Sequence, residues 1–140
     1  MSVIFISNRT SYIETRVKHR MNKNLYLNFL ETTRQVADQF PMKHIDPVCK
    51  LMLEEIALGV ARNHLLKVSD AIELKSIASR STLHRKLSIL IDAGLISLTS
   101  SSLDKRTKLL TITATGVEYF SALSKAIEKL KLPVAEVQMA

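Results

Sequence analysis

The sequence predicts a mainly α fold (α+β), in which helices surround one short β-hairpin. Three observations support this prediction: apolar residues recur at offsets of three and four in several stretches, helix-capping residues precede most of them, and two runs of strand-forming residues flank a polar loop at 101–107. With 140 residues, 46% of them hydrophobic and 24% charged, the chain has the size and composition of one globular domain.

The first 45 residues begin with a segment that fits several structures. Val3 to Ile6 could form a short strand, a disordered tail or an arm on a partner subunit, so residues 1–21 are treated as an arm. Its cations either contact DNA or are solvated, and we favour solvation; they are Arg9, Arg16, Lys18 and Arg20. Apolar residues from Leu25 to Phe40 then predict a helix from about Asn22, which Pro41 ends.

Asp46 and Pro47 predict a sharp helix start, because Asp is a good N-cap and proline needs no amide partner at the first helical position. An apolar stripe continues to about Asn63 and should form the centre of the core; it comprises Val48, Leu51, Met52, Ile56, Ala57 and Val60. Residues 65–68 could add a third strand. Ser69 is then expected to cap a brief helix that ends near Leu74.

A third capped helix should begin after Ser79 and end at Gly94, where a left-handed residue can stop a helix. Leu83, Leu87, Leu90 and Ile91 would face the core at offsets of three and four. The other faces are polar and cationic, and they carry Arg80, Ser81, His84, Arg85 and Ser88. This pattern predicts one buried face and one basic face.

The runs LISLTS and KLLTITAT predict two paired strands around the loop at 101–107. Asp104 should fix this loop by pairing with Arg106 or another cation and by accepting backbone hydrogen bonds. Thr115 is expected to cap a final helix that Pro133 stops. A basic helix followed by a hairpin predicts a winged helix-turn-helix, which would place the helix in the major groove of DNA and the loop on a phosphate backbone or in a minor groove.

The net charge of +7 is concentrated in two segments. Residues 1–25 and residues 80–108 each carry a net charge of +4, whereas the net charge is −1 for residues 26–79 and zero for residues 109–140. A basic helix and loop without a large apolar face favours nucleic acid over a membrane as the partner. A solvated basic surface is the plainer alternative.

The segment SRSTLHRKLSILIDAGLI, the pattern Asp104-x-Arg106 and the run Thr113-x-Thr115-Gly116 resemble the DNA-binding domain of the MarR family of bacterial transcriptional regulators. The resemblance spans about Asp46 to Leu123. The sequence departs from the family at Ile77-Ala78, where members usually have a glycine before the recognition helix. The resemblance implies a homodimer joined through terminal helices, and a small-molecule effector as a further partner.

These expectations divide the chain into an arm (1–21), an N-terminal dimerisation helix (22–45), a winged helix-turn-helix DNA-binding domain (46–115), and a C-terminal dimerisation helix with a tail (116–140). The candidate DNA-binding residues are Ser79, Arg80, Ser81, Thr82, His84, Arg85, Lys86, Ser101, Ser102, Lys105, Arg106 and Lys108. The candidate dimer interface comprises Leu25, Phe29, Val117, Phe120, Leu123, Ile127 and Leu130.

Other chemistries find little support. Cys49 follows the Asp46 cap closely enough for a redox switch, but its apolar neighbours favour a buried, inert thiol. His44, Asp46 and Cys49 lack the sulfur- and histidine-rich spacing of a structural zinc site, so we expect no metal and no cofactor. No phosphate-binding glycine loop or nucleophile elbow is present, so no enzyme is expected. One cysteine and no signal or membrane segment indicate the cytoplasm.

The sequence therefore predicts a sequence-specific regulator, a homodimeric repressor that binds a palindromic operator in double-stranded DNA. The alternative is a winged-helix module for protein interaction, or for replication or assembly, which does not read DNA sequence.

Overall fold

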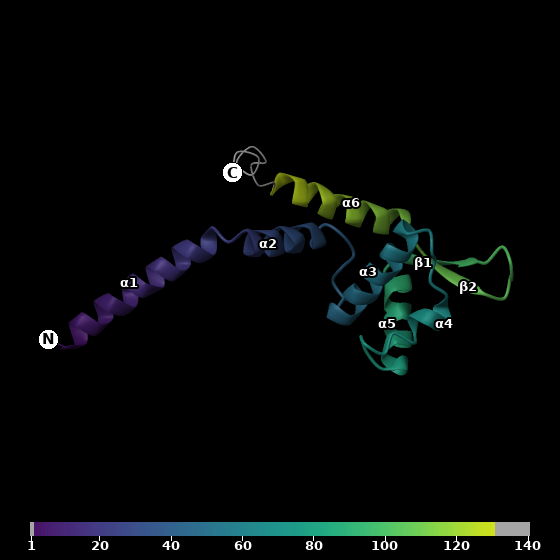
Figure 1. The fold of residues 1–140 in the computed structure, drawn as a ribbon, viewed down its shortest axis with the longest axis horizontal. Coiled ribbons are helices and arrows are strands. Elements are labelled where there is room, and N and C mark those ends of the chain that lie inside the picture. Colours follow the sequence, from purple (N-terminus) through teal and green to yellow (C-terminus); the bar gives the residue numbers. More distant parts are fainter. Residues whose placement is uncertain (1, 131–140) are drawn as a thin grey trace. The chain divides into compact units, whose positions relative to one another are not determined.

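The computed structural model describes residues 2–130, with side chains described from Thr10 onward. The elements, shown in Figure 1, are α1 (Ser2–Asn22), α2 (Leu25–Ala37), α3 (Pro47–Ala61), α4 (Val68–Ala71), α5 (Arg80–Asp92), β1 (Ile96–Ser100), β2 (Lys108–Ile112) and α6 (Ala114–Lys129). They divide into two compact units. Ala37–Ala122 form the first, which we call the head, and α1, most of α2 and the end of α6 belong to the second.

Helix α3 lies at the centre of the head, as predicted. It begins at Pro47 because the carboxylate of Asp46 accepts a hydrogen bond from the Cys49 amide at 2.8 Å. Its buried face packs against α5 and β2; this face comprises Cys49, Met52, Leu53 and Ile56. The predicted stripe was wrong at Leu51, which is 47% exposed, because the face turned to the core is centred on Leu53.

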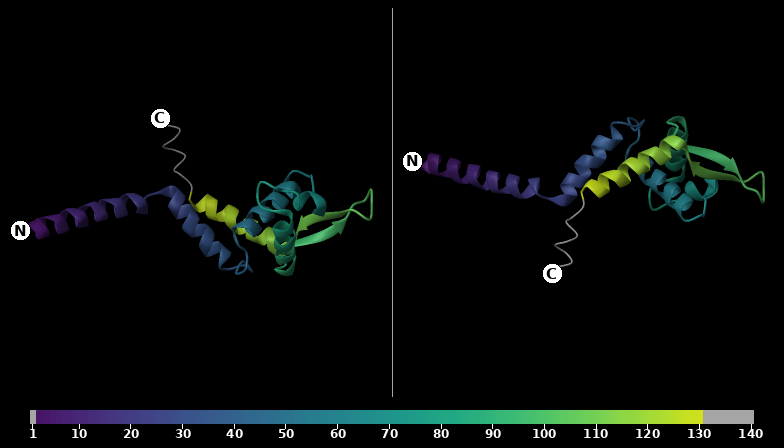
Figure 2. Two further views of the ribbon diagram at one scale, coloured as in Figure 1. Left: turned by 90° about the horizontal axis from the view of Figure 1, so that it is seen from below. Right: turned by 90° about the horizontal axis from the view of Figure 1, so that it is seen from above.

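The hairpin pairs β1 with β2 in antiparallel register, with Ile96 opposite Ile112 and Ser100 opposite Lys108. In both views of Figure 2 the two strands and their loop extend away from the helices of the head. The third strand proposed for residues 65–68 is reduced to one bridge between Lys67 and Leu109, supported by the Leu110 amide donating to the Leu66 carbonyl at 2.8 Å.

The junction between β2 and α6 is tied to the end of α5. The hydroxyl of Thr113 donates to the Gly94 carbonyl at 2.6 Å and accepts from the Gly116 amide at 3.1 Å. A Cβ on Gly116 would lie 2.5 Å from the Leu95 carbonyl oxygen, so this position has no room for a side chain. The predicted cap was therefore wrong by two residues, because Thr113 caps α6 and Thr115 lies within it.

Two further predictions need correction. Residues 2–22 form a helix, so the strand and tail alternatives for residues 3–6 were wrong. Lys67, rather than Ser69, precedes α4, and this short helix has no side-chain cap hydrogen bond.

Helix α2 starts later than predicted, because the side chain of Asn24 accepts from the Leu27 amide at 3.0 Å and starts a new helix after α1. It also ends earlier than predicted, at Ala37 rather than next to Pro41, because the Phe40 amide donates to the Ala37 carbonyl in a turn. Helix α6 ends at Lys129, and the predicted stop at Pro133 lies outside the described residues. Among residues 2–130, none of the helices is both long enough and apolar enough to cross a membrane.

Candidate nucleic-acid interface

Helix α5 has the two faces that its sequence predicts. Leu83, Leu87 and Leu90 are buried in the core, and Ile91 is half-buried. Arg80, Ser81, His84, Arg85 and Ser88 are exposed. The helix therefore presents cations, hydroxyls and an imidazole to solvent, and these groups can donate to phosphates and to base edges.

Ser79 caps α5 as predicted. Its hydroxyl accepts from the Thr82 amide at 3.4 Å and donates to the Thr82 hydroxyl at 2.9 Å. Because both hydroxyls form hydrogen bonds at the helix start, their main role is to stabilise the first turn of α5. Beside them lies a shallow open hollow lined by Ser79, Arg80, Ser81 and His84.

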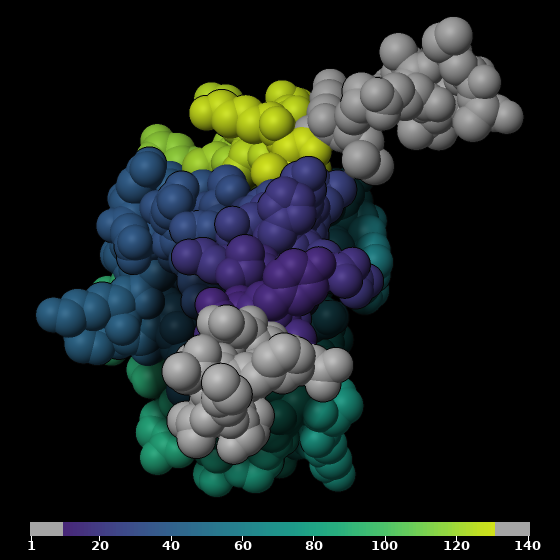
Figure 3. Space-filling view, turned by 90° about the vertical axis from the view of Figure 1, so that its left-hand side faces the viewer, coloured from purple at the N-terminus to yellow at the C-terminus, as the bar shows by residue number. Residues whose placement is uncertain are grey.

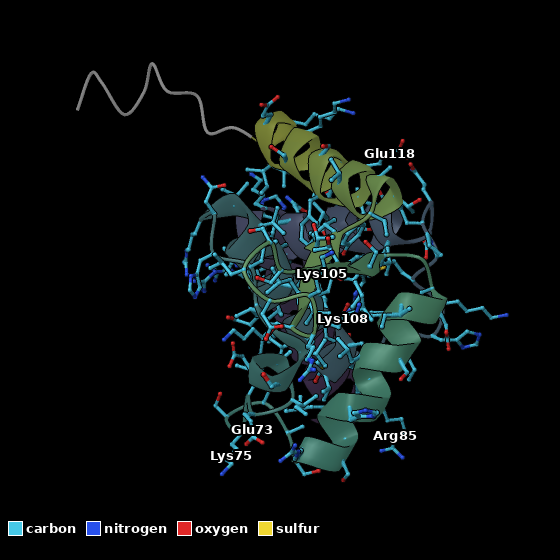
Figure 4. The ribbon with its side chains drawn as sticks, turned by 90° about the vertical axis from the view of Figure 1, so that its right-hand side faces the viewer. Glu73, Lys75, Arg85, Lys105, Lys108 and Glu118 are labelled. Atoms are coloured by element: carbon cyan, nitrogen blue, oxygen red, sulfur yellow. The ribbon has the colours of Figure 1, made fainter. Side chains whose placement is uncertain are left out.

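Arg80 has a partner that the sequence did not reveal. Its guanidinium lies 2.9 Å from the carboxylate of Glu73, and both side chains are exposed. Figure 4 looks at the head from the hairpin side and shows Glu73 and Lys75 in the loop before α5, with Arg85 on the outward flank of α5. Lys75 is exposed and joins the candidate site, although it lies outside the basic helix and the loop to which the sequence pattern pointed.

The turn before α5 forms without the glycine that the MarR family usually has. Ile77 and Ala78 donate backbone hydrogen bonds to the Leu74 carbonyl. Among the described non-glycine residues, the left-handed region is occupied by Asn63 (φ 55°), so Ile77 and Ala78 adopt ordinary negative φ values. The departure in sequence therefore requires no backbone strain.

Lys86 does not fit its predicted role in binding phosphate. Its ammonium forms an ion pair and a hydrogen bond with the carboxylate of Asp46, and its side chain is 18% exposed. The Cys49 amide, and after it Lys86, hold the pKa of Asp46 below its ordinary value. Lys86 thus joins α5 to the start of α3, and we leave it out of the candidate interface.

The loop at 101–107, which we call the wing loop, is held by backbone hydrogen bonds. The carboxylate of Asp104 accepts from the Arg106 backbone amide at 3.0 Å, as predicted, and also from the Thr107 hydroxyl at 3.2 Å. It forms no ion pair with Arg106 among the described residues, so that part of the prediction was wrong. The Arg106 side chain is exposed.

The other candidate residues of the wing fall into two groups. Ser101 is half-buried, and its hydroxyl accepts from the Leu103 amide at 3.3 Å, so it shapes the loop. Ser102, Lys105 and Lys108 are exposed, and Lys108 donates to the Ser100 hydroxyl at 3.1 Å. Figure 4 shows Lys105 and Lys108 on the hairpin that faces the viewer.

Cys49 lies inside the core, with no exposed surface. Burial, and after it the nearby Asp46 carboxylate, raises the pKa of the thiol above its ordinary value, which favours the unreactive protonated form. His44 is exposed while Cys49 is buried, and no cluster of three or more His, Cys, Asp or Glu suited to a metal ion occurs in residues 2–130.

Several residues of the predicted dimer interface are open to solvent in the single chain. Leu25 is exposed, and Val117 and Ile127 on α6 are each 54% exposed. The remaining four are half-buried: Phe29, Phe120, Leu123 and Leu130. In the head, Tyr119 rather than Val117 fills the core, where its ring packs edge-on against those of Phe40 and Phe120.

No protein-family model matches the sequence, and no curated protein matches it either. Solved structures do. Staphylococcus aureus MepR bound to ethidium bromide superimposes with a TM-score of 0.60 at 18% identity, covering 92% of this chain and 87% of MepR. A crystal structure of the S. aureus MepR–DNA complex gives a TM-score of 0.57 at 17% identity and covers 91% of each chain.

The heme sensor protein PefR from Streptococcus agalactiae, in complex with heme, gives a TM-score of 0.50 at 20% identity, with 85% of this chain and 74% of PefR covered. These likenesses confirm the mainly α winged helix-turn-helix fold and, at the level of the fold, the resemblance to MarR-family regulators.

Proposed function

We propose that this protein is a DNA-binding transcriptional regulator that reads sequence with α5. The observation that carries the proposal is the exposed face of α5, where Arg80, His84 and Arg85 stand opposite a buried leucine stripe. A helix that is anchored on one side and cationic on the other suits the major groove of duplex DNA. The likeness of the fold to MepR, which was solved in complex with DNA, supports this proposal.

In this proposal, residues 46–115 are the DNA-binding domain, and different residues contact bases, contact phosphates or stabilise the helix. Arg80, Ser81, His84 and Arg85 face base edges, and Lys75 is available for phosphate. Ser79 and Thr82 hold the start of the helix. Ser102, Lys105, Arg106 and Lys108 on the wing add backbone contacts that depend on salt rather than on sequence.

We further propose that two copies join through their terminal helices, in residues 22–45 and 116–140. The apolar side chains left open on these helices support an interface, since Leu25, Val117 and Ile127 are exposed in the single chain. A two-fold dimer would present two α5 helices to a palindrome with half-sites about one helical turn apart, and would repress by occupying an operator.

A small-molecule effector belongs to the same proposal. MepR was solved with ethidium and PefR with heme, so proteins of this fold can accept flat organic molecules. The head has a hollow between the segment before α3 and the end of α5, lined by Pro41, Lys43, His44, Ile89, Asp92 and Ala93. A ligand there would contact the end of the helix that we assign to DNA.

Replacing Arg85 tests the proposal. Arg85→Ala should weaken binding to a selected operator by about 1–3 kcal/mol if this side chain reads a base, and should relax the preference at one position of each half-site. Arg34→Ala, which removes an exposed arginine of α2, is the matched control. Unchanged affinity would remove Arg85 from the site, and binding that ignores DNA sequence would favour the interaction-module alternative.

A further inference from the structure

Basic side chains gather along one side of the last turns of α1 and in the turn that follows it. Arg16, His19, Arg20 and Lys23 follow offsets of zero, three, four and seven, and all four side chains are exposed. At 3.6 residues per turn, Arg16, His19 and Arg20 lie within about 100° of the helix circumference, and Lys23 stands in the turn that follows α1. We call these four residues the basic ridge; it belongs to the purple segment that faces the viewer in Figure 3.

One contact fixes the position of Arg16 within the ridge. The guanidinium carbon of Arg16 lies 5.8 Å from the centre of the Tyr12 ring, a cation–π distance. Tyr12, Thr15, Arg16, His19 and Arg20 together line a shallow hollow. Arg16, His19 and Arg20 of the ridge therefore border a concave surface.

The charge of the ridge is not neutralised within the described part of the chain. Glu14 lies on the opposite side of α1, and the next acidic residue along the sequence is Glu31. Among the described side chains, none of the four ridge residues forms an ion pair. A surface with several exposed cations and no internal counter-charge complements a polyanion.

An apolar stripe lies beside the ridge on α1, and its composition bears on whether the ridge binds a membrane. It consists of Ile13, Val17 and Met21, which are between 47% and 59% exposed. Helices that lie in a membrane surface combine basic residues with a broad apolar face of Trp, Phe and Leu, which these three residues do not provide. A membrane surface is therefore a poorer partner for this part of α1 than a polyanion.

We propose that the basic ridge of α1 binds the phosphate backbone of duplex DNA, as a contact separate from those of the head. This inference rests on the proposed function, because it concerns the same DNA. The ridge would add affinity that is independent of sequence, since its two arginines and its lysine carry charge but have no assigned base to read.

The experiment compares two variants that each lose three positive charges. The ridge variant carries Arg16→Gln, Arg20→Gln and Lys23→Gln, and the control carries Lys18→Gln, Lys125→Gln and Lys129→Gln, all at exposed sites. Affinity for a selected operator is measured over a series of salt concentrations. For the ridge variant the slope of log affinity against log salt should become less steep by about 2 to 3, and sequence preference should stay unchanged.

A third variant separates charge from folding. Arg16→Lys with Arg20→Lys keeps the charge and should keep the parent slope, while circular dichroism checks that each variant retains its helices. A ridge variant with the slope of the control would overturn the proposal. So would ridge-dependent binding to phosphatidylserine vesicles with an unchanged DNA slope, which would assign the ridge to a membrane. If the parent binds no DNA, the proposed function and the ridge are both wrong; if the parent binds normally and the slope is unchanged, only the ridge is.

Discussion

The carboxylate of Glu73 and the guanidinium of Arg80 form an ion pair at 2.9 Å, which joins the turn before α5 to the first residue of that helix. The side chains are 43% and 69% exposed, so the pair adds little to stability. The pair matters more for the candidate interface. Glu73 positions Arg80 and places a negative charge beside the cations that would face DNA.

Glu73→Gln should strengthen DNA binding that is independent of sequence. The substitution removes a carboxylate that repels phosphate at the candidate interface, so the salt slope should become steeper by about 0.9. Filter binding to a duplex of unrelated sequence, at several salt concentrations, measures this slope.

The matched control is Glu118→Gln, which removes the same charge from an exposed site on α6. Figure 4 shows Glu118 at the opposite end of the head from Glu73. Equal slopes for the two variants would show that Glu73 does not act on the DNA-binding surface.

Asp46→Asn should remove a pH-dependent part of the stability. The pKa of Asp46 is lowered in the folded chain by the Cys49 amide and by Lys86, so the ionised carboxylate stabilises the fold above its unfolded pKa. This contribution is lost as the pH falls through the folded pKa. Because asparagine also caps helices well, the variant tests mainly the charge.

Urea unfolding between pH 7 and pH 2.5 checks this prediction. The parent should be more stable than Asp46→Asn at pH 7, and the two should converge at the acidic end. Asp38→Asn replaces an exposed aspartate of the head as a control. A stability gap for Asp46→Asn that stays constant over the whole pH range would contradict the role given to the Asp46–Lys86 pair.

Arg106→Gln should make the salt slope for operator binding less steep by about 0.9, the loss of one phosphate contact. The loop itself should survive, because Asp104 accepts from the backbone amide of residue 106 and not from its side chain. Arg34→Gln is the control. A slope identical to that of the parent would assign Arg106 a role apart from DNA.

The elements that could be predicted from sequence carry their own local signals. Asp46 and Pro47 mark the start of α3, Ser79 and Gly94 bracket α5, and the strands flank a loop whose Asp104 makes the expected backbone hydrogen bonds. Gly94 adopts a φ of 73°, as a glycine at a helix end should. Capping and turn formation involve neighbouring residues, so the chain order is enough to reveal them.

The contacts that could not be predicted are of two kinds. Some join residues that are distant in the chain, and others involve one of two neighbouring residues that could play the same part. Lys86 and Asp46 are 40 positions apart, so Lys86 looked like one more cation of the basic helix. Thr113 and Thr115 are both suitable helix caps. Thr113 is the cap because the fold brings the Gly94 carbonyl within hydrogen-bond distance of its hydroxyl. The sequence left several structures open for residues 3–6, and the helix at Ser2–Asn22 shows that Arg16, His19 and Arg20 share one side.

Selection of DNA by the full chain tests the central claim most directly. The protein is incubated with a random duplex library at moderate salt, where binding independent of sequence weakens steeply, and the retained duplexes are sequenced. The proposed function predicts enrichment of an inverted repeat with half-sites about one helical turn apart, and loss of that enrichment in Arg85→Ala. A retained pool that stays as random as the library, with protein still bound to it, would contradict sequence reading by α5.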